Sequence, residues 1–568
     1  MDNKLVPQRP SLQSLTSFKN SPWIADILQV IFSYSTNLTQ LTSYCLVNRA
    51  WYSEAIRIIW REPQFETQVN FRQFKLVISH SKHLASLVHV LDLQDYRYFI
   101  LKYAASLLQY LPNLTAIRFP QAIPITRNVF SLLNACNFSA LKSLNYVEIY
   151  FSKEEDIQHL ESILRNCPNL EKMGLIVKSV AEYEILTDIV PLSSLKWLEV
   201  AGLELTGDLM KSLLRLTPNL ARLETFTTAH PNDFVPIIVD SCKHLEHLHL
   251  EFEYAEEDIL WDLCDEYAKD LVSHLKHFSL VYNQIVHDVP EEWMEILWRS
   301  FKSVETLRLW RVELNEAIIY SFSEALPKQL RILDLCSISV TEPSSLGAWE
   351  EFFVSCGGQL TSLTISHSLL PARLGHVIAK YCVRLEELVI RSCKFTDTSV
   401  IAVVQRCGST LTKIKLYDTS FTESSLQAIC ENCNKLEELT LFRTEHWLQP
   451  LDTSPLVPYI VNHGAILRSL CIRGWKTTNE LLNNLANHAQ NLRELDFEND
   501  TGLQDSILQQ VMKSCQLRQL NITTRHDCGG LTAEMIELVD KYYVFAKRIQ
   551  NPLSLDMETI YGILYGSP

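Results

Sequence analysis

The stretches LEELVI (residues 385–390), LTKIKL (411–416) and LEELTL (436–441) share one pattern, with apolar residues at the first, fourth and sixth positions. Their first residues lie 26 and 25 residues apart. The segments between them carry apolar residues at helical spacing, as at Leu426, Ile429, Cys430 and Cys433. This region therefore alternates a strand with a helix at a nearly constant interval.

The same pattern extends over most of the chain. Its first-position residues, called anchors below, are Val88, Leu114, Leu144, Leu170, Leu195, Leu220, Leu245, Leu275, Val304, Leu330, Leu360, Leu385, Leu411, Leu436, Leu467, Leu492 and Leu517. A strand–helix unit repeated every 20–29 residues or so is typical of leucine-rich repeats, because one such unit cannot cover its own apolar faces and needs a neighbour on each side. The sequence predicts an α/β solenoid of about 17 repeats, with a parallel inner sheet and outer helices.

The cysteines follow the phase of the repeats. Cys382, Cys407 and Cys433 stand three or four residues before an anchor, and Cys393 is the ninth residue of its repeat. This spacing resembles the cysteine-containing subclass of leucine-rich repeats. We therefore expect most of the 15 cysteines to be small buried side chains with reduced thiols, in a cytoplasmic or nuclear protein. Zinc or redox chemistry at the isolated Cys430-x-x-Cys433 pair is an alternative.

Composition narrows the function classes. With 568 residues, 47% of them apolar and 21% charged, the chain can bury an extended core. Its net charge of −15 argues against nucleic-acid binding, and no apolar run is long enough to cross a membrane. Phosphate loops, dinucleotide fingerprints, zinc-protease motifs and nucleophile elbows are absent. We predict a protein that is not an enzyme and has no catalytic residues, cofactor or metal.

The N-terminal segment before the repeats has a different character. Residues 23–32 form a dense apolar face at helical spacing, and two further helical segments are expected at 41–51 and 52–60. Three short helices are too few to bury so much apolar surface by themselves. Part of that surface should therefore contact another surface.

The stretches WIADILQVIFSY (residues 23–34), CLVNRAW (45–51) and IIW (58–60) resemble an F-box. The residues that match the family register are Asp26, Ile27, Leu28, Ile31 and Phe32. Trp23 and Ile24 replace its common Leu-Pro pair. An F-box directly before cysteine-type repeats is a known family architecture. The resemblance implies that a Skp-type linker protein docks on this segment; the contact residues it implies are Trp23, Ile24, Ile27, Leu28, Ile31, Phe32, Val47 and Trp51.

The family resemblance further implies a substrate-recognition adaptor of an SCF-type cullin-RING E3 ubiquitin ligase. The linker protein would connect the chain to a cullin, and the repeats would hold a protein substrate on their concave face. Two alternatives remain. The helices before the repeats could be only an N-terminal cap of the solenoid. The chain could also be a leucine-rich-repeat scaffold or inhibitor that binds a protein partner without a ligase.

The chain therefore divides, by expectation, into five parts. They are a flexible arm (1–20), an F-box-like helical domain (21–63), a linker or first helix (64–86), the solenoid (87–530), and a C-terminal cap and tail (531–568).

Side chains alternate along a strand, so the third, fifth and seventh positions of each repeat should face the concave surface. Aromatic residues and arginine are enriched at protein interfaces, which singles out candidate target-binding residues. The aromatic and basic residues chosen at these positions in the second half of the solenoid are Arg308, Trp310, Lys413, Lys415, Tyr417, Phe442 and Arg473; Trp447 is added from the insertion at residues 447–457.

We expect the target segment to be acidic or phosphorylated at its centre. A basic stretch of it should lie near the last repeats, because Glu494, Asp496 and Glu498 share one strand. The proline-rich insertion at residues 447–457 is predicted to be a loop that contacts the target without belonging to the core.

Three histidines are expected close together. His247 and His249 lie on one face of a strand, and His277 should lie beside His247 on the next strand. Neutral imidazoles are good metal ligands, but no carboxylate or thiol completes a set by spacing. A metal site and an exposed polar stripe both remain open.

Overall fold

A computed structural model describes part of the chain. The described residues are Leu28, Leu41, 43–63, 68–92, 107–118, 141–151, 160–162, 164–180, 190–202, 207–227, 234–252, Leu263, 269–286, 291–312, 314–325, 328–336, 346–366, 373–393, 395–418, 420–443, 451–499, 503–515, Leu517 and 519–524. The expected N-terminal arm and C-terminal tail lie outside them. The described chain divides into two compact units, residues 1–220 and 221–568.

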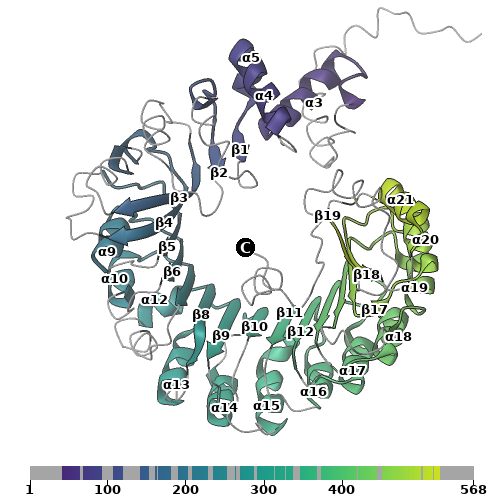
Figure 1. The fold of residues 1–568 in the computed structure, drawn as a ribbon. Helices are drawn as coiled ribbons and strands as arrows, with labels where there is room; N and C mark the ends of the chain where they lie inside the picture. Colours follow the sequence, from purple (N-terminus) through teal and green to yellow (C-terminus); the bar gives the residue numbers. More distant parts are fainter. Residues whose placement is uncertain are drawn as a thin grey trace, which may run out of the picture. The chain divides into compact units, whose positions relative to one another are not determined.

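The first unit contains a group of helices followed by the earliest repeats (Figure 1). Its elements are α3 (Arg49–Arg61), α4 (Gln68–His80), α5 (Lys82–Leu87), β1 (Val90–Asp92), β2 (Ala116–Arg118), β3 (Ser143–Phe151), β4 (Lys172–Val180), β5 (Trp197–Gly202) and α9 (Gly207–Arg215). The five strands pair in parallel in sequence order. Register shifts interrupt the pairing of β3 with β4 at two places.

The second unit is the longer run of repeats. Its strands are β6 (Arg222–Thr227), β7 (His247–Phe252), β8 (His277–Val286), β9 (Thr306–Val312), β10 (Ile332–Cys336), β11 (Ser362–Ser366), β12 (Glu387–Arg391), β13 (Lys413–Tyr417), β14 (Glu438–Phe442), β16 (Ser469–Arg473), β18 (Glu494–Asn499) and β19 (Gln519–Thr524), with a small pair β15 (Leu451–Asp452) and β17 (Trp475–Lys476). The twelve main strands pair in parallel in sequence order, with one register shift, between β8 and β9.

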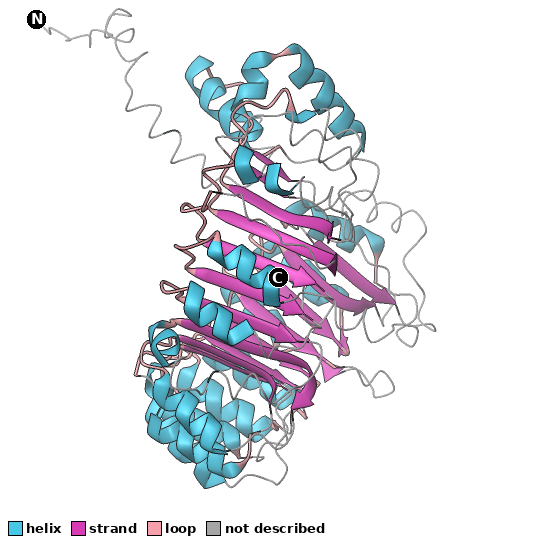
Figure 2. Cartoon of the chain, turned by 90° about the vertical axis from the view of Figure 1, so that its left-hand side faces the viewer, coloured by secondary structure: helices cyan, strands magenta, loops and turns pink. Residues whose placement is uncertain are grey.

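Helices alternate with these strands. They are α10 (Phe234–Ser241), α12 (Lys269–His274), α13 (Glu291–Ser300), α14 (Glu316–Ala325), α15 (Leu346–Cys356), α16 (Leu374–Tyr381), α17 (Asp397–Cys407), α18 (Glu423–Asn432), α19 (Leu456–His463), α20 (Asn479–His488) and α21 (Asp505–Ser514). Figure 1 shows them on the outer side of the second unit, and Figure 2 shows strands running side by side. The predicted leucine-rich-repeat solenoid is confirmed.

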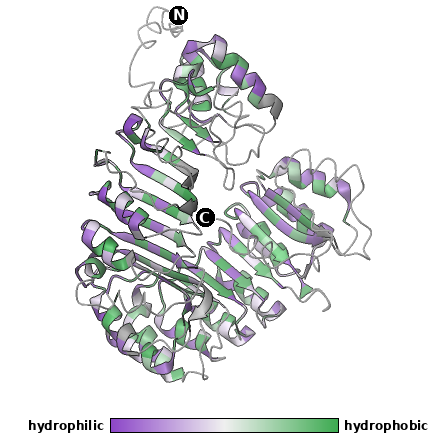
Figure 3. Ribbon diagram, turned by 60° about the vertical axis from the view of Figure 1, so that its left-hand side comes forward, coloured by the Kyte–Doolittle hydropathy of each residue, from purple (hydrophilic) through white to green (hydrophobic). Residues whose placement is uncertain are grey.

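The anchors form the core. Sixteen of the seventeen are at most 1% exposed, and only Leu517 is half-buried. The fourth-position residues Leu388, Ile414 and Leu439 are equally buried, while the residues between them reach the opposite face. Figure 3 shows this alternation of polar and apolar residues along the strands. A shift of one residue would turn these apolar side chains to the exposed face, so their burial sets the register of the strands.

The turn after the strand was only partly predictable. The eighth residue of a repeat has a left-handed backbone at Arg311, Ser392, Asp418 and Gly474. In two of these turns the backbone N–H of that residue donates to the next strand, from Ser392 to Tyr417 (2.8 Å) and from Asp418 to Phe442 (2.8 Å). In these repeats the chain turns away from the strand at a residue with positive φ, a conformation that is uncommon for residues other than glycine.

The cysteines behave as their phase predicted. Cys382, Cys393, Cys407 and Cys433 are at most 5% exposed, and every cysteine in the described part of the chain is a free thiol. Burial raises the pKa of Cys433 to about 12 and that of Cys407 to about 11. These thiols fill apolar space and stay protonated, as small core residues do.

Two local predictions are corrected. The expected helix boundary between Trp51 and Tyr52 is wrong, because α3 begins at Arg49 and Asn48 caps it by accepting hydrogen bonds from the N–H groups of Ala50 and Trp51. The region at 64–86 contains the two helices α4 and α5, not one. The Asn48 cap sets the start of α3 about one turn before the predicted boundary, and the spacing of apolar residues does not reveal such a cap.

The insertion at residues 447–457 is also corrected. Residues 447–450 lie outside the described part of the chain, but Leu451–Asp452 pairs in parallel with Trp475–Lys476. Thr453 is 1% exposed, and its hydroxyl donates to the carbonyl of Lys476 (2.7 Å). Residues 451–457 are therefore part of the folded second unit, contrary to the prediction that the insertion lies outside the core.

Candidate functional site

A concavity of about 220 Å³ lies on the inner face of the second unit, over strands β13, β14, β16, β18 and β19. We call it the inner-face pocket. Its lining residues are Lys415, Tyr417, Thr440, Phe442, Ser469, Leu470, Cys471, Arg473, Glu494, Leu495, Asp496, Gln519 and Asn521. Four of the predicted target-binding residues, Lys415, Tyr417, Phe442 and Arg473, thus line one pocket. Most of the other lining residues occupy the third or fifth position of their repeat, so the spacing of the repeats could have identified them as well.

One wall of the pocket is aromatic. The rings of Tyr417 and Phe442 lie on neighbouring strands with centroids 6.0 Å apart. Arg391 lies over the Tyr417 ring at 4.3 Å, and Arg473 lies 5.6 Å from the centre of the Phe442 ring. Such cation–ring contacts hold the rings in place while leaving them partly accessible. Burial raises the pKa of the Tyr417 hydroxyl, so it remains protonated and neutral.

The floor of the pocket is an ion pair. Arg473 donates from Nε and from a terminal nitrogen to the two oxygens of Asp496, at 2.5 and 2.8 Å. Asn521 donates its side-chain N–H to the same carboxylate at 3.2 Å. Burial acts to lower the pKa of Arg473, but Asp496 outweighs it and the pKa is raised. A bidentate pair of this kind is rigid and strongly oriented.

Both lysines on β13 are also paired. Lys413 and Lys415 approach the carboxylate of Glu438 on β14 at 3.3 and 3.2 Å. Burial opposes the charge of Lys415, but Glu438 raises its pKa overall; the lysines in turn lower the pKa of Glu438 against its own burial. The register places Lys413 directly opposite Glu438, so the parallel strands create this contact.

The three carboxylates of β18 are not one acidic patch. Glu498 is 1% exposed and accepts the backbone N–H of Gly474 at 3.1 Å, while Asp496 holds Arg473. Glu494 is exposed, and its carboxylate has no ion pair or hydrogen bond with any residue that the structure describes. The side chains at the third, fifth and seventh positions therefore play different roles although they share a strand.

The remaining target-binding candidates lie elsewhere. Arg308 and Trp310 are on β9, which β10, β11 and β12 separate from β13. Arg308 approaches Asp334 at 3.8 Å, and burial raises the pKa of Asp334 to about 6 although Arg308 opposes the shift. Trp447 lies outside the described residues. The predicted single surface thus resolves into the inner-face pocket and a separate β9–β10 region.

The histidines do come together. The rings of His247 and His277 are 5.2 Å apart, and Nδ1 of His249 lies 2.8 Å from the hydroxyl of Ser279. Burial, helped by Arg222 and His277, lowers the pKa of His247 to about 3, so it is neutral at pH 7. Among the described residues, no group of three or more metal-ligating side chains is close enough to hold an ion.

The helices of the first unit carry their own small core. Leu28, Leu41 and Ala55 are buried, with Trp51 packed partly against them and edge-on to Tyr44 at 5.3 Å. Leu28 is 4% exposed, so its side chain packs inside this core. Val47 is 55% exposed. Trp23, Ile24, Ile27, Ile31 and Phe32 lie outside the described residues.

Leu46 and Tyr52 extend the apolar surface at Val47. They are 88% and 50% exposed, and they flank the first turn of α3. Contiguous patches of exposed apolar side chains mark interaction sites on many soluble proteins. We call Leu46, Val47 and Tyr52 the α3 apolar edge.

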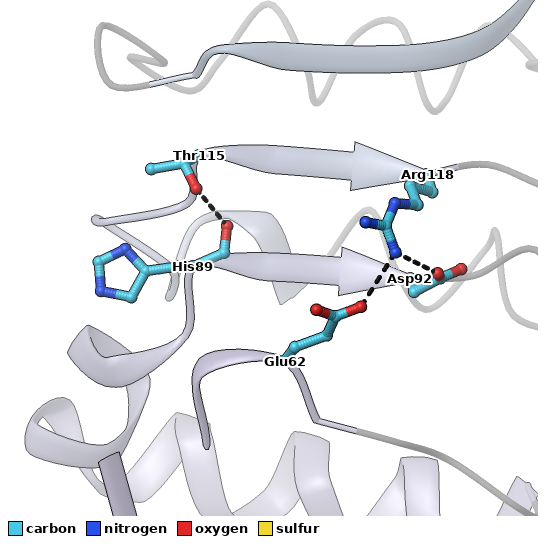
Figure 4. A network of polar contacts seen from close by, with 5 residues as sticks. All are labelled: Glu62, His89, Asp92, Thr115 and Arg118. Atoms are coloured by element: carbon cyan, nitrogen blue, oxygen red, sulfur yellow. Dashed lines mark hydrogen bonds and ion pairs between the residues drawn. The ribbon is translucent and has the colours of Figure 1, made fainter. Parts of the chain in front are cut away.

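A polar junction connects α3 to the first strands (Figure 4). Arg118, at the end of β2, donates to Asp92 on β1 at 2.8 Å and to Glu62, which follows α3, at 2.9 Å. The backbone N–H of His89 donates to the carbonyl of Arg61 at 2.9 Å, and the Thr115 hydroxyl donates to the carbonyl of His89 at 3.0 Å. The helical module and the first two repeats therefore form one piece within the first unit.

No protein-family model and no curated protein matches this chain. Among solved structures, it is similar to the yeast Rad7–Elc1 complex, with 13% identity, a TM-score of 0.33, and coverage of 96% of this chain and 99% of that one. It is similar to the TLR13–ssRNA13 complex (14%, TM-score 0.35, 75% of this chain and 60% of that one) and to a Bacteroides fragilis protein (15%, TM-score 0.28, 42% and 67%). At such scores these similarities carry no functional argument, and the fold is established by the strands and helices themselves.

Within the described residues, no helix is both long enough and apolar enough to span a lipid bilayer.

Proposed function

We propose that this chain is the substrate-recognition adaptor of an SCF-type cullin-RING E3 ubiquitin ligase. The helical module docks a Skp-type linker protein, which connects it to a cullin, and the inner face of the repeats binds a protein target. The chain itself performs no covalent step, since its contribution is to hold the target in place for other subunits.

The observation that carries this proposal is the α3 apolar edge. Leu46, Val47 and Tyr52 are exposed in the very segment whose sequence resembles an F-box, and the same segment contributes Leu28, Leu41 and Ala55 to a small core. A helical module that served only to cap the solenoid would turn its apolar residues inward, toward the repeats. An apolar edge that faces solvent instead suits a docked partner.

The inner-face pocket supports the second half of the proposal. It combines two aromatic rings with an arginine, the residue types most enriched where protein interfaces gain their affinity. Its side chains are held by ion pairs and ring contacts on regular strands, so the surface is organised before a partner arrives. Such preorganisation reduces the entropy lost on binding.

The docking half is tested by co-purification with a Skp-type linker protein. We expect Val47→Glu to weaken capture of the linker by at least about tenfold, because it places a charge in an apolar contact. Val354→Glu is the matched control, since Val354 on α15 is 58% exposed and Val47 is 55% exposed. Circular dichroism should show both variants folded.

If Val47→Glu captures the linker as well as the unchanged protein does, the α3 apolar edge is not the docking surface. If the unchanged protein captures no Skp-type protein at all, the ligase role is wrong. The chain would then be a repeat scaffold that binds its partner without a ligase.

A further inference from the structure

We propose that the inner-face pocket accepts a cationic side chain, lysine or arginine, from the bound protein. This inference rests on the proposed target-binding role of the inner face and specifies the chemistry of the ligand. It replaces the expectation that the lysines and arginine of this face attract an acidic or phosphorylated segment. It agrees with the expectation of a basic stretch near the last repeats, and it narrows the acceptors from three carboxylates to Glu494 with Asn521.

The cations of the pocket are already neutralised. Arg473 holds both oxygens of Asp496, and Lys415 shares the carboxylate of Glu438 with Lys413. The side chain of Arg473 is 9% exposed and that of Asp496 is 20% exposed. An incoming anion would have to displace Asp496 and leave a largely buried carboxylate without its partner, which is strongly unfavourable.

The acceptors of the pocket are the groups left over. The carboxylate of Glu494 is exposed at the rim and unpaired among the described residues. Asn521 must turn its N–H group toward Asp496, because a carboxylate only accepts, and its side-chain oxygen is then buried without a hydrogen-bond partner. A buried oxygen of this kind favours a donor strongly. A charged rim acceptor and a buried neutral acceptor on adjacent strands together suit a donor with a positive charge.

The rest of the pocket fits the stem of such a side chain. Its volume of about 220 Å³ is below the range of about 300–1,000 Å³ that small-molecule sites usually occupy. One long side chain can enter it, with its methylene groups against Phe442 and its charged end toward Glu494. The chain's net charge of −15 also favours approach of a basic segment.

The test uses the full chain and five fluorescein-labelled peptides, Gly-Ala-Ala-X-Ala-Ala-Gly, in which X is arginine, lysine, norleucine, glutamate or phosphoserine. Fluorescence anisotropy at low salt gives each affinity. We expect the arginine and lysine peptides to bind at least about fivefold more tightly than the other three, with the preference falling as salt rises. Glu494→Gln should remove most of that preference, and Glu494→Lys should transfer it to the glutamate peptide.

Two further variants sharpen the test. Gln519→Glu adds a carboxylate at an exposed rim position beside Glu494 and should raise the preference for the arginine peptide. Glu480→Gln is the control for Glu494→Gln: it removes one negative charge from an exposed position of α20 outside the pocket lining. It should leave all five peptide affinities unchanged. Both positions are exposed, so neither variant should impair folding.

Two results would overturn the inference. In the first, the glutamate or phosphoserine peptide binds best and Glu494→Gln does not weaken the arginine peptide; the pocket then binds anions, and its role in target binding stands. In the second, all five peptides bind equally and no Glu494 variant matters. Neither result depends on capture of the linker protein, so a failure here is distinguishable from a failure of the ligase role.

Discussion

A single aspartate illustrates how neighbouring repeats are joined. Asp397, in the first turn of α17, accepts hydrogen bonds from the backbone N–H of Thr422 (2.8 Å), from its hydroxyl (2.7 Å) and from the hydroxyl of Ser425 (2.5 Å). Burial acts to raise the pKa of Asp397, but these donors from the next repeat outweigh it and lower the pKa. One carboxylate thus stabilises the start of the following helix, α18, as well as its own.

We expect Asp397→Ala to lower the free energy of unfolding by about 1–3 kcal/mol at pH 7, because three donors lose their acceptor. The folded pKa lies below the unfolded one, so this contribution is fully present above about pH 4 and is lost as the pH falls through the lowered folded pKa. Urea unfolding of both proteins from pH 7 to pH 2.5 or so measures the difference.

Asp208→Ala is the control for that experiment. Asp208 also stands in the first turn of a helix but is exposed, and no hydrogen bond of its side chain is seen among the described residues. Removing its carboxylate should lower the free energy of unfolding only slightly. An Asp397→Ala difference that persisted unchanged at low pH would contradict the carboxylate's role.

At the scale of elements, the outer helices pack closely at defined points. A Cβ atom added to Gly375 on α16 would lie 2.5 Å from the Cα of Ser399 on α17 and 2.8 Å from its carbonyl oxygen. Glycine is therefore needed there to let two helices approach.

The long interval between Leu436 and Leu467 holds an insertion that contributes β15 to the β15–β17 pair. In this pair, Trp475 is buried and its ring stacks on Phe421 at 5.8 Å between centroids.

We predict that Gly375→Ala destabilises the second unit by about 1–3 kcal/mol, because the clash is with backbone atoms that cannot move aside. Alanine's better helix propensity, worth about 1 kcal/mol, opposes this loss without cancelling it. Thermal unfolding followed by circular dichroism measures the change. Gly358→Ala is the control, since an added Cβ there meets no atom within 4 Å; equal melting temperatures for the two variants would contradict the packing argument.

At the scale of the whole molecule, the chain is two units with different regularity. The first unit has register shifts between β3 and β4, and its strands β1 and β2 are three residues long. The second unit pairs twelve strands with one register shift, between β8 and β9, and repeat proteins gain stability from each regular interface between neighbours. The first unit should therefore unfold more easily than the second.

Buried thiols report this order. Burial raises the pKa of Cys167 in the first unit to about 12 and that of Cys407 in the second to about 11, so both are inert when folded. We expect brief alkylation at rising urea concentrations, read by mass spectrometry, to label Cys167 before Cys407. Cys45, which is only partly buried, serves as the positive control for the reagent. Simultaneous labelling of the two buried thiols would mean that the units unfold together.

The sequence by itself determined the repeat. Burying an apolar anchor such as Leu411 is favourable whichever residues surround it. The spacing of the anchors alone therefore located the strands and the positions that face the inner surface. The same alternation placed Tyr417, Phe442 and Arg473 on the inner face.

The sequence did not determine how those side chains share their charges. Which carboxylate neutralises Lys415 or Arg473 depends on residues 23 positions or more away, Glu438 and Asp496, brought alongside by the parallel register. It also left Glu494 indistinguishable from Glu498, although one is exposed and the other is buried. Only the tertiary structure decided these points, because Coulombic contacts act through distance in space and not through separation in sequence.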